Sequence, residues 1–239
     1  MVPAMMLRTL SFLILLLLGI GTAAAGDRRY SVTDFDRVLV EGPYAVRLTV
    51  GRPSSAVATG STQALEAVTI DVQGTTLRIR RNANAWGGYP GRPIEPATIM
   101  LTTRNLRSAR LAGTGSIAVA GARGLQVEFS VEGSGKLSAS ALTADNLGLV
   151  VRGSGSIELA GTAKSLQANV QGAGSLLASA LTTETATIAA ATSGDILLTA
   201  RRAATVTAHG LGRTEITGTA ACTLSGTHAG EVRCGPARP

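Results

Sequence analysis

The sequence predicts an all-β protein, a right-handed parallel β-helix (β-solenoid) with coils of about 20 residues. The first observation is a Gly-x-Gly step that recurs, with weaker late copies, between Ala112 and Gly235. Its second glycines are Gly115, Gly135, Gly155, Gly174, Gly194, Gly212 and Gly230, spaced by 20, 20, 19, 20, 18 and 18 residues. Such a period is typical of stacked units. It predicts at least seven coils here, wound right-handedly like other parallel crossovers.

The second observation is the alternation of apolar and polar residues inside each copy. In the copy 153–172, Ile157 and Leu159 alternate with polar residues, and the run 166–171 does so again after Gly161. A period of two places successive side chains on opposite faces of a strand. Each repeat is therefore expected to hold two short half-buried strands separated by small, turn-forming residues.

The third observation is that like residues recur at like positions. Three inward columns are expected: Val131, Val151, Val170, Ala190 and Ala208; Phe129, Leu149, Ala168, Ile188 and Val206; and Ile117, Leu137, Ile157, Leu176 and Ile196. A solenoid needs such ladders because each coil packs only on its neighbours. A transmembrane β-barrel also alternates, but it needs aromatic girdles, and after Tyr89 only Phe129 is aromatic. The solenoid is favoured.

Residues 1–25 are expected to be a secretory signal peptide. Arg8 is the only charge in this segment, 10–20 is a short apolar core, and Ala23-Ala24-Ala25 is a small-residue cleavage site. The alternative is an uncleaved anchor, although the apolar core is short for a membrane span. We expect an exported protein, periplasmic or at the cell surface, with no transmembrane span after cleavage.

Residues 26–239 are expected to form a single solenoid domain. Within it, 112–235 holds the regular Gly-x-Gly repeats and 26–111 the atypical N-terminal coils and a loop. Five of the six aromatic residues in 26–239 precede position 90, so the first coils are expected to carry that bulk. The ends of a solenoid are sheet edges and need bulky capping units.

The stretch 82–96 breaks the rhythm with three prolines and three glycines, which predicts a loop. Its Trp86 and Tyr89 could stack on a sugar or enter a partner's pocket, so they are the speculative ligand-binding residues. The alternative is that Trp86 folds back over a gap in the core.

The chain is basic, with a formal net charge of +7. This charge favours weak attraction to anionic envelope surfaces, or it reflects no more than a solvated surface. A nucleic-acid partner is not expected, because the basic residues are dispersed and no recognised nucleic-acid motif occurs.

No catalytic or metal site is predicted, and no cofactor. His209 and His228 are the only histidines, too few for a structural zinc site. Asp195, Arg213 and Glu231 fall at equivalent outward positions on successive coils, where alternating charges neutralise one another rather than forming a catalytic carboxylate pair.

Two cysteines in an exported chain are expected to form a disulfide, Cys222–Cys234. By the repeat register Cys234 faces inward, at the position that Ile216 holds one coil earlier. Cys222 lies near Leu224 in the preceding strand. Its parity is opposite to the inward positions, unless 226–230 absorbs an extra residue pair and Cys222 shifts to face inward. Such a bond would keep the terminal coil from fraying.

Three parts of the sequence carry a family likeness. They are the opening Phe35/Val38/Val40-Glu-Gly-Pro-Tyr-Ala-Val46, the strand Leu77-Arg-Ile79 and the Gly-Ser-Gly-Ser-Ile steps. Over roughly 35–235 the chain resembles the putative auto-transporter adhesin, head GIN domain family. The resemblance implies an exported bacterial protein with a right-handed parallel β-helix. It supplies no functional residues.

Three functions fit these observations. The expected one is a non-catalytic, adhesin-like binding module of the cell envelope that uses a repetitive polar surface and takes a glycan or an envelope protein as partner. The alternatives are a carbohydrate-active β-helix enzyme, for which only the Trp86 loop offers aromatic residues, and a structural or signalling partner of another envelope protein.

Overall fold

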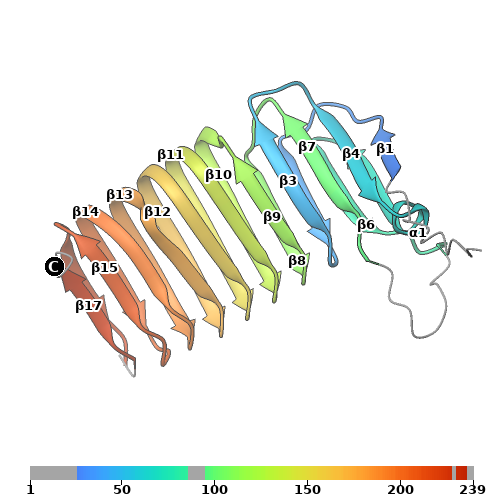
Figure 1. Ribbon diagram of the computed structural model, residues 1–239. Coiled ribbons are helices and arrows are strands. Elements are labelled where there is room, and N and C mark those ends of the chain that lie inside the picture. Colours follow the sequence, from blue (N-terminus) through green and yellow to red (C-terminus); the bar gives the residue numbers. More distant parts are fainter. Residues whose placement is uncertain (1–25, 86–94, 228–229, 236–239) are drawn as a thin grey trace, which may run out of the picture.

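The computed structural model describes residues 26–85, 95–227 and 230–235, and these form a β-solenoid of about six turns (Figure 1). The elements of the N-terminal part are β1 (Gly26–Tyr30), β2 (Arg37–Glu41), β3 (Ala45–Val50), β4 (Ser55–Gly60), α1 (Thr62–Glu66), β5 (Val68–Gln73), β6 (Thr76–Arg81) and β7 (Thr98–Thr103). Those of the regular part are β8 (Ser108–Gly113), β9 (Ser116–Ala120), β10 (Arg123–Gly133), β11 (Lys136–Gly153), β12 (Ser156–Gly172), β13 (Ser175–Thr192), β14 (Ile196–Ala208), β15 (Thr214–Gly218), β16 (Ala221–Ser225) and β17 (Val232–Gly235).

The predicted inward columns are confirmed by the parallel pairing of successive coils. Ile117, Leu137, Ile157, Leu176 and Ile196 are partners in turn, and the other two columns hold the register expected of them. Thr214 and Val232 continue the column of Ile117, which therefore has seven levels between β9 and β17. Seven levels delimit six turns, so the expected count of seven complete coils is one too high: the last level is only the short strand β17.

Each coil has three inward-facing sets of residues where the alternation predicted two. In the coil 136–153 the buried residues are Leu137 and Ala139, then Leu142 and Ala144, then Leu147, Leu149 and Val151. The parity changes twice because the chain bends twice. The sequence pattern predicts a turn for the middle set, because two alternating residues are too few to indicate a strand. We call this middle segment of each coil the connecting side.

The glycine corners serve two separate physical needs. The first glycine of a step has a positive φ, as at Gly153 with φ 107°, where glycine alone is unstrained. The second lacks room for a side chain. A Cβ on Gly155 would stand 2.6 Å from the carbonyl oxygen of Gly135 and 2.5 Å from Cγ1 of Val131. The repeat therefore keeps two glycines because each has a different constraint.

At the N-terminal end, the order of coils in space differs from their order in sequence. Strand β2 pairs in parallel with β6 on one side and β8 on the other, and β3 lies likewise between β7 and β9. The first coil along the chain is thus the second in space. After β3 the chain leaves the stack, and it returns through β6 and β7 as the outermost parallel coil.

An antiparallel layer covers that outermost coil. Strand β5 pairs with β6, β4 with β7 and β1 with β4, all antiparallel, and α1 joins β4 to β5 (Figure 1). The outer edges of β6 and β7 are thereby paired, and β1 and β5 become the edge strands at this end. We call it the capped end. The expected aromatic bulk is here: Phe35 and Tyr44 are only 3% and 4% exposed.

Tyr44 links the first coil to the cap. Its hydroxyl donates a hydrogen bond of 3.2 Å to the carbonyl of Ala67, which follows α1. Burial raises the pKa of Tyr44 above its ordinary value of 10.0, and the charge of Arg81 offsets part of this effect. The neutral phenol is therefore the form that the fold stabilises.

Tyr44→Phe is expected to make stability less sensitive to alkaline pH. A raised folded-state pKa contributes stability that is complete below about pH 10 and is lost as the pH rises through the folded-state value. Near pH 7 the variant should lose only about 1 kcal/mol, because the carbonyl of Ala67 also accepts from the Asn82 amide. Urea denaturation of both proteins between pH 8 and 11 measures this. Parallel pH curves would contradict the assignment.

Candidate functional site

A hollow lined by charged residues lies on the connecting side near the capped end. Its volume is about 720 Å³, and its walls come from 34–37, 103–108 and 123–128, with Ser54 and Thr75 at the margin. The hollow exists because only four residues, 104–107, connect β7 to β8, whereas the next coil has six, 121–126, before the buried Val127. The later coil therefore protrudes beyond the earlier one. We call this hollow the step groove.

Charged side chains of both signs line the step groove. Arg104 contacts Asp34 at 3.4 Å, and the hydroxyl of Ser54 donates to the same carboxylate at 2.8 Å. Arg107 Nε lies 3.1 Å from Oδ2 of Asp36. These pairs hold the two walls together with exposed guanidinium groups, which makes each pair weak on its own.

Several groups of the groove have unused bonding capacity. Arg37 and Arg123 have no carboxylate within ion-pair distance in the described part of the chain. The buried atom Oδ1 of Asp36 has no hydrogen-bond donor there either. Glu128 accepts one hydrogen bond of 2.8 Å, from the amide of Gln126. The groove thus combines free cations with carboxylate oxygens that are only partly satisfied.

Apolar side chains add a floor and a rim. Phe35 and Leu106 are buried beneath the groove, whereas Leu125 on its rim is 77% exposed. Gly124 lies beside it at the inward position that Ala144 fills in the next coil, yet Gly124 is exposed because no earlier coil covers it. The floor of the groove therefore includes backbone at Gly124 beside the buried side chains of Phe35 and Leu106.

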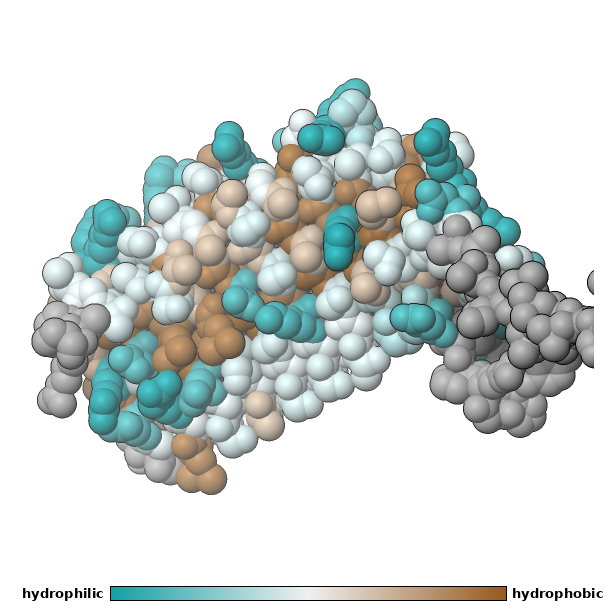
Figure 2. Space-filling model, in the orientation of Figure 1, coloured by the Kyte–Doolittle hydropathy of each residue, from teal (hydrophilic) through white to brown (hydrophobic). Residues whose placement is uncertain are grey.

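A second, shallower surface runs along the outer face of β3, β9 and the first parts of β11 to β14. We call it the β9 face. Its trough, about 750 Å³ in volume, is lined by small residues together with Leu177 and Leu197. Figure 2 shows a band of hydrophobic colour along this side of the molecule. The ion pair of Lys136 with Glu158, at 2.6 Å, crosses it. It offers apolar contact but few converging polar groups.

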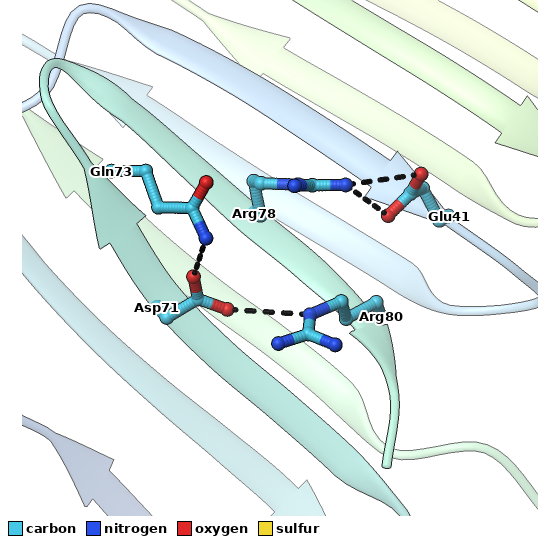
Figure 3. Close-up of polar contacts among 5 residues, drawn as sticks. All are labelled: Glu41, Asp71, Gln73, Arg78 and Arg80. Atoms are coloured by element: carbon cyan, nitrogen blue, oxygen red, sulfur yellow. Dashed lines mark hydrogen bonds and ion pairs between the residues drawn. The ribbon is translucent and has the colours of Figure 1, made fainter. Parts of the chain in front are cut away.

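A charge network lies over the outer side of β2, β5 and β6 (Figure 3). Arg78 Nη2 is 3.2 Å from Oε2 of Glu41, and Arg80 Nε is 3.5 Å from Oδ1 of Asp71, which also accepts from Gln73. The network joins an antiparallel cap strand to the parallel coils. Its carboxylates and guanidinium groups are already paired with each other, so we assign it a structural role.

The predicted charge ladder is correct in part. Arg213 lies 3.8 Å from Asp195, as expected of neighbouring coils, but Glu231 pairs at 2.6 Å with Arg233, two residues further along the chain. The pair of Glu132 and Arg152 forms across coils at 3.9 Å. The interpretation of these residues as charge compensation rather than a carboxylate pair remains the simplest.

The predicted binding residues Trp86 and Tyr89 lie outside the described residues, as does His228. In the sequence the two aromatic residues fall between β6 and β7, and their role stays a prediction. Among the residues that the structure describes, no group of three His, Cys, Asp or Glu side chains could hold a metal ion. In those same segments, no helix is long and apolar enough to cross a membrane.

Cys222 and Cys234 meet at the C-terminal end. Their Cα atoms are 6.5 Å apart, within the range of disulfides, and the structure pairs them. Cys234 is the register partner of Ile216, as expected, and Cys222 that of the buried Ala204. Of the two placements open for Cys222, the inward one is therefore found. Leu224 faces the same way as Cys222 and is 43% exposed, because no further coil covers it in the described chain.

Replacing both cysteines by serine is expected to loosen the last coil. A bridge across a loop of this length stabilises by up to about 3 kcal/mol, mainly by restricting the unfolded chain. Hydrogen exchange of the β16 and β17 amides should rise, while exchange in β11 and β12 serves as the internal control. Two free thiols in the purified, non-reduced protein, detected by mass spectrometry, would contradict the predicted bond.

The comparison with protein families gives one match. The model described as "Putative auto-transporter adhesin, head GIN domain" matches residues 34–220, most of the chain. No match is found among curated proteins.

Solved structures share the architecture. A putative adhesin from Bacteroides fragilis has a TM-score of 0.76 at 18% identity, covering 87% of this chain and 96% of its own. A putative lipid binding protein from Parabacteroides distasonis has a TM-score of 0.68 at 19% identity, with 91% and 98% covered. A putative adhesin from Parabacteroides merdae has 0.62 at 17% identity, with 91% and 98% covered. At these identities the likeness establishes the fold.

Proposed function

Because the chain belongs to the putative auto-transporter adhesin, head GIN domain family, we propose that it is a non-catalytic binding module of the cell envelope. It acts by presenting a rigid lateral surface to a glycan or to another envelope protein. In this proposal residues 1–25 direct export and are removed, and the solenoid works in the periplasm or at the cell surface.

The observation that carries the proposal is the set of outward polar columns on the side formed by β8 and the last parts of β10 to β14. Gln167, Thr187, Thr205 and Thr223 are register partners on four successive strands. Beside them the hydroxyls of Thr207 and Ser225 lie 3.0 Å apart. Strand spacing repeats these hydrogen-bonding groups every ~4.8 Å.

Such a surface suits binding because it is ordered before a ligand arrives. Its side chains stand on strands that, except for the last one, β16, are paired on both sides, so little conformational entropy remains to be lost. A repeating polymer would meet like groups on successive coils, and each added contact would strengthen attachment. These are the properties that an adhesion surface needs.

The trough of the β9 face favours a second candidate, association with lipid. Leu177 and Leu197 face outward there among small residues, and one solved structure of the same fold is named a putative lipid binding protein. The trough is shallow and open, so it would contact lipid along its length rather than enclose an acyl chain. We rank this candidate second because polar groups dominate the other sides.

Three assays on the mature chain 26–239 test the proposal. They are a glycan array, pull-downs from envelope extracts, and sedimentation with anionic and neutral vesicles. Selective retention on particular glycans or on one envelope protein is expected. Sedimentation with vesicles alone would replace the first candidate with the second. No retention in any of these assays would overturn the binding role.

A further inference from the structure

We propose that the step groove binds a saccharide that carries a carboxylate, such as a chain of uronic acid units. This inference rests on the proposed binding function, and it names the site and the ligand class. The observation behind it is a preformed hollow in which two unpaired guanidinium groups stand among partly satisfied carboxylate oxygens.

The size and rigidity of the groove suit a short segment of a glycan. About 720 Å³ lies within the ~300–1,000 Å³ that small-molecule sites occupy. The hollow arises from a difference in length between two connecting sides, and its floor includes the backbone at Gly124. It is therefore present without a ligand and needs no loop movement to open.

The two free arginines favour a carboxylate on the ligand. Arg104 and Arg107 are engaged by Asp34 and Asp36, whereas Arg37 and Arg123 have no acidic partner among the described residues. A guanidinium group binds a carboxylate through two parallel hydrogen bonds, which fixes the orientation of the bound group. Arg123 stands at the start of β10 and Arg37 at the start of β2, so they approach the groove from different walls.

The acidic groups of the groove favour hydroxyls on the rest of the ligand. Asp34, Asp36 and Glu128 would repel a densely charged anion such as a polyphosphate, but each can accept a hydrogen bond from a sugar hydroxyl. The orphan Oδ1 of Asp36 gives this carboxylate spare acceptor capacity, which a small reorientation would present to the ligand. Leu125 on the rim offers an apolar surface to the C–H face of a sugar ring.

The experiment uses the mature chain and two matched ligands, a galacturonic acid trimer and the corresponding neutral galactose trimer. The double variant Arg37→Gln, Arg123→Gln removes both free guanidinium groups. The control variant Arg201→Gln, Arg202→Gln changes the charge equally on β14, four strands along the stack from β10. Its two arginines are also exposed and have no acidic partner in the described chain. Circular dichroism verifies that all three proteins are folded.

Calorimetric titration should show that the wild type and the control bind the acidic trimer, with an affinity that falls as salt is added. The groove variant should bind it at least ten-fold more weakly. Equal affinity for the two trimers, undiminished binding by the groove variant, or no binding of the acidic trimer by the wild type would each overturn the proposal. If the wild type still binds other glycans on the array, only the assignment of site and ligand fails, and the binding function stands.

Discussion

Phe129→Ala is expected to lower the free energy of unfolding by about 3–5 kcal/mol, the usual cost of removing a buried ring. Phe129 is 1% exposed and is the largest of the fully buried side chains. Its register partners are Ala109 on one side and Leu149 on the other. The ring fills the space that Ala109 leaves, so truncation would place two alanines on successive levels and open a cavity. Urea denaturation measures the loss.

Phe129→Leu is the matched control, because leucine occupies the same column at Leu149. It should cost less than about 1.5 kcal/mol, as conservative apolar exchanges in cores usually do. If the alanine and leucine variants were equally stable, the ring would not fill the column, and the small-against-large packing described for this level would be wrong.

Gly155→Ala is expected to cost about 2–3 kcal/mol, although it adds a single methyl group to a corner. The new Cβ would stand 2.6 Å from the carbonyl oxygen of Gly135, and backbone of the neighbouring coil cannot rotate away as a side chain can. The two coils would have to separate at this corner. Thermal unfolding should show the loss, and hydrogen exchange should place it at β11 and β12.

Gly124→Ala provides the control for this substitution. An added Cβ there would meet its nearest atoms at 3.5 Å, an ordinary contact, so stability should change by less than about 0.5 kcal/mol. A Gly155→Ala protein as stable as the Gly124→Ala protein would show that close approach does not explain the second glycine of each step.

The regular coils could be predicted from sequence because the spacing of like residues in each column specifies how successive coils align. Val131, Val151 and Val170 are alike and evenly spaced, so only one stacking aligns them. At the capped end Leu77, Val38 and Ala109 occupy successive levels of one column, in an order that differs from the sequence. Any order of these apolar residues would bury them equally well, and no pattern in the sequence specifies which level comes first.

The step groove could not be predicted from sequence for a different reason. Its walls come from 34–37, 104–107 and 123–128, which are separated by up to about 90 positions. The hollow itself results from the shortness of one connecting side. A sequence pattern identifies the residues that form strands, but it does not identify a space that no residue fills. By contrast, composition alone indicates a binding role for Trp86 and Tyr89, and that role stays a prediction.

The measurement that tests the account most directly is recovery of a bound ligand. A glycan that the mature chain retains on the array is incubated with it to equilibrium, released, and weighed by mass spectrometry beside an untreated sample. Saturable binding and a ligand of unchanged mass are expected, because the surface binds without reacting. A shortened or modified glycan that accumulates with time would contradict it and would support the carbohydrate-active enzyme instead.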